Sequence, residues 1–356
     1  MTTRTRTAKK PAAKKAADKR PLIHFIGLGG TISGGANGRL TIMDNLEHIK
    51  ALQKTVGSAP NLHDFIRVKA EHPHVGGSGS LGAKMWLELA RKGNEYLSRP
   101  DVSGIVYTHG TSTMEELTYW LHLTVRSKKP IVMTGAMRAP RFLGTDADNS
   151  LLNAATVVAA PESWGRGALL VLNNEIHGAR DVTKQNGYSR QTFGNRELGI
   201  LGYAAEETFY ARGLTHQPSY YRYPSRKHTY QSEFDVSKLK DLPSVYIVDS
   251  YEGCDGLFVE AAVKAGAKGI VVNGMGGGAP AGEAQRNALE AAAKKGVAVV
   301  YTTRTGAGLV VRSQDLIDKR IITGDNLNCY HARVLLMLAL TKTKDPNGIQ
   351  KMFDTY

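Results

Sequence analysis

Two threonines and one lysine stand at positions where the chain could perform hydroxyl chemistry. Thr31 and Thr111 each follow a short apolar run and lie in a glycine-containing turn, and Lys184 ends the polar segment Ala179–Lys184. A threonine is a weak nucleophile until a base removes its proton. A lysine becomes such a base when burial or nearby positive charge lowers its pKa from ~10.4 toward neutrality. Strand-end threonines are more often turn residues and lone lysines are more often solvated, so spacing alone leaves both interpretations open.

The same turns do not fit a nucleotide loop or a metal site. Gly27 and Gly29 begin a G-x-G-x-x-G pattern, but Ile32 occupies its last position, and no G-x-x-x-x-G-K-[ST] motif occurs. The two histidines of the Glu71–His74 turn lack an H-E-x-x-H context and are typical of exposed loops. His109 fits a general base and a packed histidine that bonds the turn backbone equally well. We therefore expect no metal and no cofactor.

Short apolar runs supply the strands that must position these turns. The expected strands are Leu22–Leu28, Gly104–Thr108, Pro130–Thr134, Ala168–Leu172, Val245–Val248, Gly269–Val272 and Val297–Tyr301. Amphipathic segments lie among them, at Ala83–Tyr96, Met114–Val125 and Ala281–Lys295. A last, apolar helix is expected near His331–Thr341, packed on the second domain. Continuous apolar strands alternating with helices indicate an α/β fold with a mainly parallel sheet covered on both faces. In such sheets, ligands bind at the carboxyl ends of the strands.

One stretch interrupts this alternation. Residues 217–243 are polar, aromatic and proline-bearing, which is typical of a connection between domains. The sequence therefore predicts a larger N-terminal α/β domain at residues 21–216, a linker at 217–243 and a smaller C-terminal α/β domain at 244–356. The length of 356 residues agrees with two domains.

Half of the net charge of +14 lies in residues 1–20, which hold eight Lys or Arg and one acid. This Ala/Lys/Thr-rich tail has no apolar face and predicts a disordered basic extension. Weak contact with nucleic acid is one interpretation of its charge, and a solubilising extension is the simpler one. It lacks the apolar core of a secretory signal, and no run approaches the ~18 apolar residues of a membrane span. We expect a cytoplasmic protein without membrane contact.

Several ordered motifs resemble those of the bacterial L-asparaginase/glutaminase family, particularly its periplasmic, tetrameric type. Gly29–Ile32 (Gly-Gly-Thr-Ile) is similar to the first family signature, and Thr108–Glu116 (Thr-His-Gly-Thr-x-Thr-Met-Glu-Glu) is similar to the second. Further matching blocks are Val132–Arg138, Gly178–Lys184, Phe234–Leu239 and His331–Leu336. The resemblance extends from about residue 22 to Tyr356. Two signatures in order, together with the Arg-Asp-Val-Thr-Lys block, make it specific.

The resemblance implies a mainly parallel N-terminal sheet, a smaller flavodoxin-like C-terminal domain and a homotetramer. It also implies hydrolysis of a side-chain carboxamide at a site completed by a neighbouring subunit. By motif, Thr31 is the primary nucleophile, and Thr111, hydrogen-bonded to Lys184, activates the second attack. Backbone N–H groups around Thr111 hold the oxyanion. The substrate-binding positions by the same match are Ser78, Gly79, Ser80, Gly110 and Ser112.

Several departures from the family pattern affect recognition of an α-ammonium group. Ser112 replaces the aspartate of the second signature, Gly79 stands at a glutamine and Ala279 at an asparagine. The loop after the first signature lacks its tyrosine, and the acidic residue that a neighbouring subunit lends near residues 307–312 is absent. Drift or a misaligned glycine-rich turn explains each change singly. Together they remove nearly every group that would hold an amino cation, whereas the hydrolytic set is intact.

We therefore interpret the chain as an asparaginase-family amidohydrolase that acts on a small-molecule carboxamide, with a preference shifted away from a free α-ammonium. Two alternatives stay open. One is an ordinary L-asparaginase with rearranged contacts, and the other is a catalytically inactive paralogue that binds a small amide or carboxylate. Retention of Lys184 favours an enzyme, because a buried lysine is costly unless it is used or paired.

Overall fold

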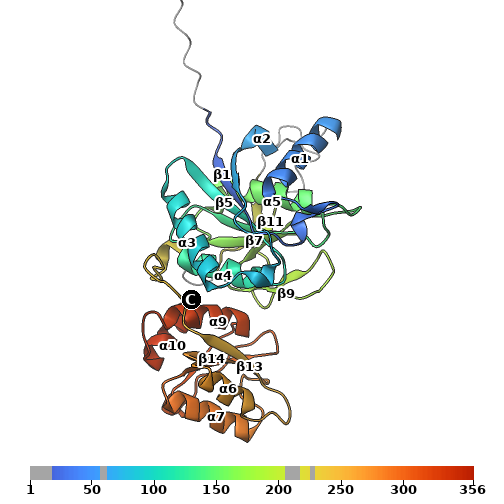
Figure 1. Ribbon diagram of the computed structural model, residues 1–356. Helices are drawn as coiled ribbons and strands as arrows, with labels where there is room; N and C mark the ends of the chain where they lie inside the picture. The colour runs from blue at the N-terminus through green and yellow to red at the C-terminus, as the bar shows by residue number, and fades with distance from the viewer. Residues whose placement is uncertain (1–17, 57–61, 205–216, 225–228) are drawn as a thin grey trace, which may run out of the picture.

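The computed structural model describes residues 18–56, 62–204, 217–224 and 229–356, which form two α/β domains (Figure 1). Most of the basic tail expected at residues 1–20 and part of the segment expected as a linker lie outside these residues. Within the described ranges, none of the helices combines the length and the apolar character needed to cross a membrane.

An eight-stranded mixed sheet forms the centre of the N-terminal domain, in the order β12-β11-β8-β7-β6-β5-β1-β4. Its strands are β1 (Leu22–Gly27), β4 (Arg67–Glu71), β5 (Val102–Thr108), β6 (Ile131–Thr134), β7 (Ala168–Leu172), β8 (Glu175–Gly178), β11 (Gly202–Tyr203) and β12 (Ser219–Tyr220). The strands from β4 to β7 pair in parallel, and β8, β11 and β12 add an antiparallel edge. Part of the segment expected as a linker, residues 217–243, thus belongs to this sheet. A two-residue strand is too short to show a period in the sequence.

Successive side chains of the central strands point into two separate cores. In β7, Leu170 belongs to a core with α3 and α4, whereas Leu169 and Val171 belong to a core with α1 and α5. This two-residue alternation places helices on both faces of the sheet (Figure 1). It also explains why the central strands appear in the sequence as continuous apolar runs. The helices are α1 (Ile42–Val56), α2 (Leu62–Phe65), α3 (Ala83–Ser98), α4 (Met114–Thr124) and α5 (Ala147–Ala159).

The C-terminal domain contains a four-stranded parallel sheet in the sequential order β13-β14-β15-β16. Its elements are β13 (Val245–Asp249), α6 (Leu257–Lys264), β14 (Gly269–Gly274), α7 (Glu283–Lys294), β15 (Ala298–Thr303), α8 (Gln314–Asp318), β16 (Ile321–Thr323), α9 (Cys329–Ala339) and α10 (Pro346–Thr355). Right-handed crossovers in a sequential sheet put their helices on one face, so α6 and α7 share a core there. The opposite face receives α9 and α10. Flavodoxin has its second strand at the edge, so the likeness lies in the layers and not in the strand order.

Helix α9 joins the two domains. Its residues share one continuous core with α4 of the N-terminal domain and with the C-terminal sheet. The ring of His331 lies 5.0 Å from that of Tyr119 on α4. Arg180, which follows β8, donates from Nε to the backbone oxygen of Tyr356 at 2.7 Å and from Nη2 to Asp325 at 2.8 Å. The two domains are therefore joined by a shared apolar core and by hydrogen bonds.

Two small hairpins lie beside the large sheet and complete the scaffold of the site. The strands β2 (Gly34–Gly35) and β3 (Gly38–Arg39) pair directly after β1 and a short 3-10 turn at Thr31–Ser33. The strands β9 (Val182–Lys184) and β10 (Phe193–Asn195) form the second hairpin, in which Lys184 pairs with Phe193.

Candidate active site

Three loops meet at the carboxyl ends of the parallel strands β1, β4 and β5. The backbone of Gly30 donates to the carbonyl oxygen of Gly76 at 3.2 Å, which ties the first two loops together. A Cβ atom on Gly30 would lie 2.4 Å from the backbone nitrogen of Gly110, and one on Gly110 would lie 2.8 Å from Cβ of Ser78. Gly30 also has a φ of 86°, a conformation that residues with a side chain rarely adopt. Glycine is therefore required for these loops to touch.

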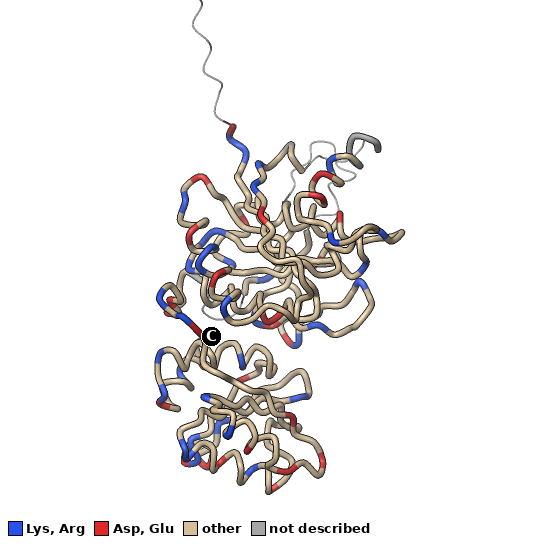
Figure 2. Tube along the Cα trace, viewed as in Figure 1, with Lys and Arg blue, Asp and Glu red and all other residues tan. Residues whose placement is uncertain are grey.

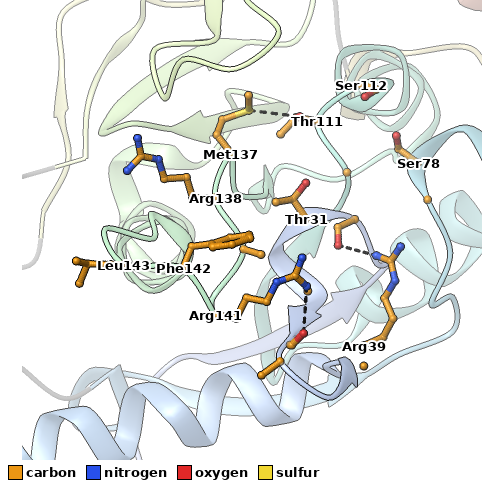
Figure 3. Close-up of a pocket in the computed structure, with 18 residues that line it drawn as sticks. Thr31, Arg39, Ser78, Thr111, Ser112, Met137, Arg138, Arg141, Phe142 and Leu143 are labelled. Carbon is orange, nitrogen blue, oxygen red and sulfur yellow. Dashed lines mark hydrogen bonds between the residues drawn. The ribbon is translucent and has the colours of Figure 1, made fainter.

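The joined loops line one side of a cleft with a volume of about 1110 Å³ (Figure 3). Of the positions predicted from the sequence, the cleft brings together Thr31, Ser78, Gly110, Thr111 and Ser112. Gly79 and Ser80 are not among its lining residues within the described chain. The hydroxyl of Ser80 instead donates to the carbonyl of Gly77 at 2.6 Å and contacts His74 Nε2 at 2.9 Å, so it stabilises the turn.

Lys184 reaches Thr111 from the β9–β10 hairpin, as the sequence predicted. Its Nζ donates to Oγ1 of Thr111 at 2.6 Å and lies 3.8 Å from the sulfur of Met137. Burial lowers the pKa of Lys184 below its ordinary value, and the neighbouring carboxylate of Glu115 partly opposes this. A lysine with a lowered pKa holds more of the neutral amine that can accept a proton.

Glu115 is a site residue to which the sequence analysis gave no role. It lies in the first turn of α4, where a negative charge is favoured by the helix dipole, and it is buried. Its Oε2 accepts a hydrogen bond from the backbone nitrogen of Lys184 at 2.7 Å. Burial raises the pKa of this carboxyl group, and hydrogen bonds from Thr183 and Lys184 oppose the rise. Glu115 thus orients the hairpin that carries Lys184. Its place in the second signature was the available signal.

Thr31 starts the 3-10 turn after β1, and its side chain is exposed to the cleft. Figure 3 shows its hydroxyl directed toward the segment that carries Thr111 and Ser112. Two arginines fix the backbone on either side of it. Arg39 donates to the carbonyl of Gly30 at 2.9 Å, and Arg141 donates to the carbonyl of Gly35 at 3.1 Å.

The charge of the cleft was also missed by the sequence analysis. Its lining includes Arg39, Arg138 and Arg141, and no aspartate or glutamate stands among the described lining residues. Arg138 ends a block that matches the family, which was a partial signal. Nothing in the sequence shows that Arg39, from a hairpin after β1, and Arg141, from a loop after β6, line the same cleft.

The histidines near the site are buried or half-buried, and none of them lines the described part of the cleft. His109 is buried behind the cleft, where burial lowers its pKa to about 4, and neither ring nitrogen has a hydrogen-bond partner in the described chain. The expectation that His72 and His74 are exposed is wrong, because both are half-buried. His72 Nδ1 accepts from the backbone nitrogen of Ile42 at 3.0 Å. The first N–H groups of a helix need such an outside acceptor.

Comparison with known proteins shows the family. Residues 22–215 match the family model "Asparaginase, N-terminal", and residues 244–353 match "Glutaminase/Asparaginase C-terminal domain". The chain belongs to the asparaginase family. The resemblance stated from the motifs is therefore confirmed, and so is the α/β class with a larger and a smaller domain.

Relatives match over nearly the whole chain. L-asparaginase 2 of Bacillus subtilis is 40% identical over 349 residues, which cover 98% of this chain and 90% of the relative. L-asparaginase 2 of Escherichia coli is 38% identical, with 96% and 95% covered. A glutaminase-asparaginase of Pseudomonas fluorescens is 32% identical, with 97% and 93% covered. A solved structure described as a probable cytoplasmic L-asparaginase from Campylobacter jejuni is similar with a TM-score of 0.86 at 34% identity, and it covers 95% of this chain and 100% of its own.

Proposed function

We propose that this asparaginase-family protein hydrolyses the carboxamide of a small molecule with Thr31 as nucleophile and the Thr111–Lys184 pair as the base that activates water in the second step. The observation that carries the proposal is the 2.6 Å hydrogen bond between Lys184 Nζ and Thr111 Oγ1, in a cleft that Thr31 also lines. A hydroxyl nucleophile and a lysine with a lowered pKa are the groups that acyl transfer without a metal requires.

The proposed reaction has two steps. In the first, Oγ1 of Thr31 attacks the amide carbon, its proton passes to the leaving nitrogen, and ammonia departs from an acyl–threonine ester. In the second, the Thr111–Lys184 pair takes a proton from water, the resulting hydroxide attacks the ester carbon, and the C–O bond to Thr31 breaks. The pair then returns the proton to Oγ1 of Thr31, which leaves the free acid and regenerated Thr31. Backbone N–H groups around Gly110 and Thr111 are the proposed donors to the oxyanion in both steps.

The cleft chemistry also favours a substrate without a free α-ammonium. Asparagine carries an ammonium group that needs acceptors once water is removed from it. The described lining offers three arginines and no carboxylate, and Ser112 supplies only a hydroxyl. Each lost hydrogen bond to a charged group costs roughly 1.5–3 kcal/mol. We infer that the substrate carries a carboxamide and a carboxylate, and that Ser78 and nearby N–H groups hold the carboxylate. The α-amino group of asparagine is absent from this substrate or is acylated.

The test compares kcat/KM for L-asparagine, for its des-amino analogue succinamate and for N-acetyl-L-asparagine. The natural protein should prefer the two analogues. Ser112→Asp should raise the asparagine-to-succinamate ratio at least about tenfold, because it restores an anion for the ammonium. Ser112→Asn is the matched control of equal size without charge and should not do so.

The alternative of an ordinary L-asparaginase is favoured by the names of the relatives from Bacillus and Escherichia. Efficient hydrolysis of L-asparagine at micromolar concentration by the natural protein would establish this alternative. It would also contradict the proposed preference for substrates without an α-ammonium. Absence of ammonia release with every amide, together with retained ligand binding, would instead identify an inactive paralogue.

We also propose a homotetramer, as the family resemblance implies, and a cytoplasmic location, as for the Campylobacter neighbour. The cleft lining includes Phe142 and Leu143, two residues that are 53% and 100% exposed, as expected of a surface that a neighbouring subunit covers. The Haemophilus influenzae relative is named periplasmic, so cell fractionation tests the location, and light scattering tests the assembly. A fully active monomer would contradict the tetramer.

A further inference from the structure

Two arginines form a second polar region of the cleft. In the view of Figure 3, Thr31 lies between Thr111 on one side and the guanidinium groups of Arg39 and Arg141 on the other. Arg39 donates to the carbonyl of the residue before Thr31. A Cβ atom on Gly34 would lie 3.6 Å from Nη1 of Arg141 and 3.1 Å from the carbonyl oxygen of Thr31. Both guanidinium groups therefore lie close to the backbone that carries the proposed nucleophile.

Each of these arginines keeps donors for a ligand. A guanidinium group has five N–H donors. Arg39 donates one of these N–H groups to the carbonyl of Gly30, and Arg141 donates one to the carbonyl of Gly35. The ring of Phe142 lies 4.7 Å from the guanidinium carbon of Arg141 and holds it in place. Neither arginine has a carboxylate partner within the described residues, although Arg99 and Arg180 are paired with Asp101 and Asp325.

The charged residues that line the described part of the cleft are all basic, whereas the rest of the surface carries both signs of charge. Figure 2 shows acidic and basic residues interspersed along both domains, whereas the charged residues that line the cleft are Arg39, Arg138 and Arg141. A concave site lined by charges of one sign attracts ligands of the opposite sign. The fork of an arginine matches the two oxygens of a carboxylate.

We infer that Arg39 and Arg141 form an anion subsite and that the substrate carries a second carboxylate in addition to the one expected at Ser78. The amide part of this statement rests on the proposed function, whereas the anion part does not. The substrate class is a dianion with one primary carboxamide, such as an asparagine whose α-nitrogen bears an acidic acyl group. Such a molecule has no ammonium group, in agreement with Ser112.

A purely structural role makes a different prediction. Because both arginines also brace the loops beside Thr31, their loss could displace the nucleophile. That displacement would lower kcat for every amide alike. Loss of an anion subsite would instead act mainly on KM and only for the dianion. The two roles are therefore separated by a pair of substrates that differ in one carboxylate.

The experiment measures kcat and KM for N-succinyl-L-asparagine, a dianion, and N-acetyl-L-asparagine, a monoanion. The natural protein should favour the dianion in kcat/KM by about tenfold or more. Arg39→Gln and Arg141→Gln should each lower this preference at least fivefold, chiefly through KM. Arg286→Gln, on the exposed side of α7, removes the same charge elsewhere and should not change it. An equal fall for both substrates, or an unchanged preference in both cleft variants, overturns the subsite.

A binding measurement separates this inference from the proposed reaction. Calorimetry with N-succinyl-L-aspartate, which has no primary carboxamide, should show binding that Arg39→Gln and Arg141→Gln each weaken about tenfold or more. If the protein hydrolyses no amide but still shows this arginine-dependent binding, the reaction is wrong and the subsite stands. If amides are hydrolysed and the binding does not depend on the arginines, the subsite is wrong and the reaction stands.

Discussion

Serine and threonine hydroxyls lie near the carboxyl ends of the strands in both domains, but their hydrogen bonding differs between the domains. In the N-terminal domain, the hydroxyl of Thr31 has no hydrogen-bond partner within the described residues and lies at a cleft of about 1110 Å³. In the C-terminal domain, Oγ of Ser250 donates to Gln285 at 2.7 Å and accepts from the backbone nitrogen of Ala281 at 2.7 Å. Oγ1 of Thr303 donates to the carbonyl of Gly276 at 2.6 Å.

This difference distinguishes hydroxyls that are available to a ligand from hydroxyls that are not. Both sheets are parallel at these ends, and both supply hydroxyls and glycine turns where ligands bind in open α/β sheets. A hydroxyl whose donor and acceptor capacity is used by its own domain contributes to stability and has little left for a ligand. Thr31 is left free in the cleft that Thr111, the partner of Lys184, also lines, and this supports placing the proposed chemistry at the N-terminal sheet.

The largest expected contrast comes from one threonine in each domain. Thr31→Ala should lower kcat/KM on the order of 10³-fold or more, which corresponds to several kcal/mol of transition-state stabilisation. It should leave the unfolding free energy nearly unchanged, because this side chain is exposed and unpaired in the described chain. Thr302→Val removes a buried hydrogen bond of 2.7 Å to Val272 and should cost about 1 kcal/mol of stability with no loss of activity. Near-natural turnover of Thr31→Ala in an ammonia-release assay would remove its assigned role.

The second contrast uses two glycines with positive φ. Gly30→Ala places a Cβ atom 2.4 Å from the backbone of Gly110, whereas at Gly276, with a φ of 42°, the added atom meets nothing within 4 Å. Gly276→Ala should therefore cost only the backbone strain of about 1–2 kcal/mol. Gly30→Ala should destabilise the protein more and lower kcat/KM by roughly 10²-fold, since misplacing a catalytic group by about 1 Å has that effect. Equal melting temperatures and full activity in both variants would show that the loop contact is dispensable.

The third contrast concerns pH. The pKa of His109 is lowered to about 4 by burial, below the unfolded value of about 6.5. The unfolded chain therefore binds a proton that the folded chain excludes between these values. The unfolding free energy should fall as pH drops from about 6.5 to 4, by up to about 3 kcal/mol from this group. His109→Gln should reduce that slope in urea titrations, and His48→Gln, on a half-exposed side chain, should not. An unchanged slope in His109→Gln would show that other groups dominate.

The smallest effect is expected from Glu115→Gln. Glutamine retains an oxygen that accepts from the backbone of Lys184, but it removes the charge that holds the pKa of Lys184 up. The pKa of Lys184 should therefore fall further, and the acidic limb of the kcat profile should move to lower pH. A limb that moves to higher pH would mean that a different group controls the rate.

Much of the scaffold could be predicted from the sequence because the information is local. The expected strand Ala168–Leu172 has the same bounds as β7, and the expected helix Met114–Val125 ends one residue beyond α4. Apolar runs and helical periodicity indicate which faces are buried. The family motifs contain Thr31, Thr111 and Lys184, which identified these residues as candidates for the site. The two-residue strand β12 and the support that His72 gives to α1 were missed, because each depends on a distant partner.

The sequence by itself determined the α/β class, the central strands and the residue types available for hydroxyl chemistry. Only the tertiary structure decided which of those polar groups are paired and which are free. Lys184 and Thr111 are separated by 73 positions in the chain, and Arg141 lies 106 positions from the carbonyl of Gly35 that it binds. Spacing along the chain does not record such contacts, because they exist only after β1, β5, β6 and the β9–β10 hairpin have packed. The physical reason is that a hydrogen bond and the local polarity around a charge act over a few ångströms in space, whatever the distance in sequence.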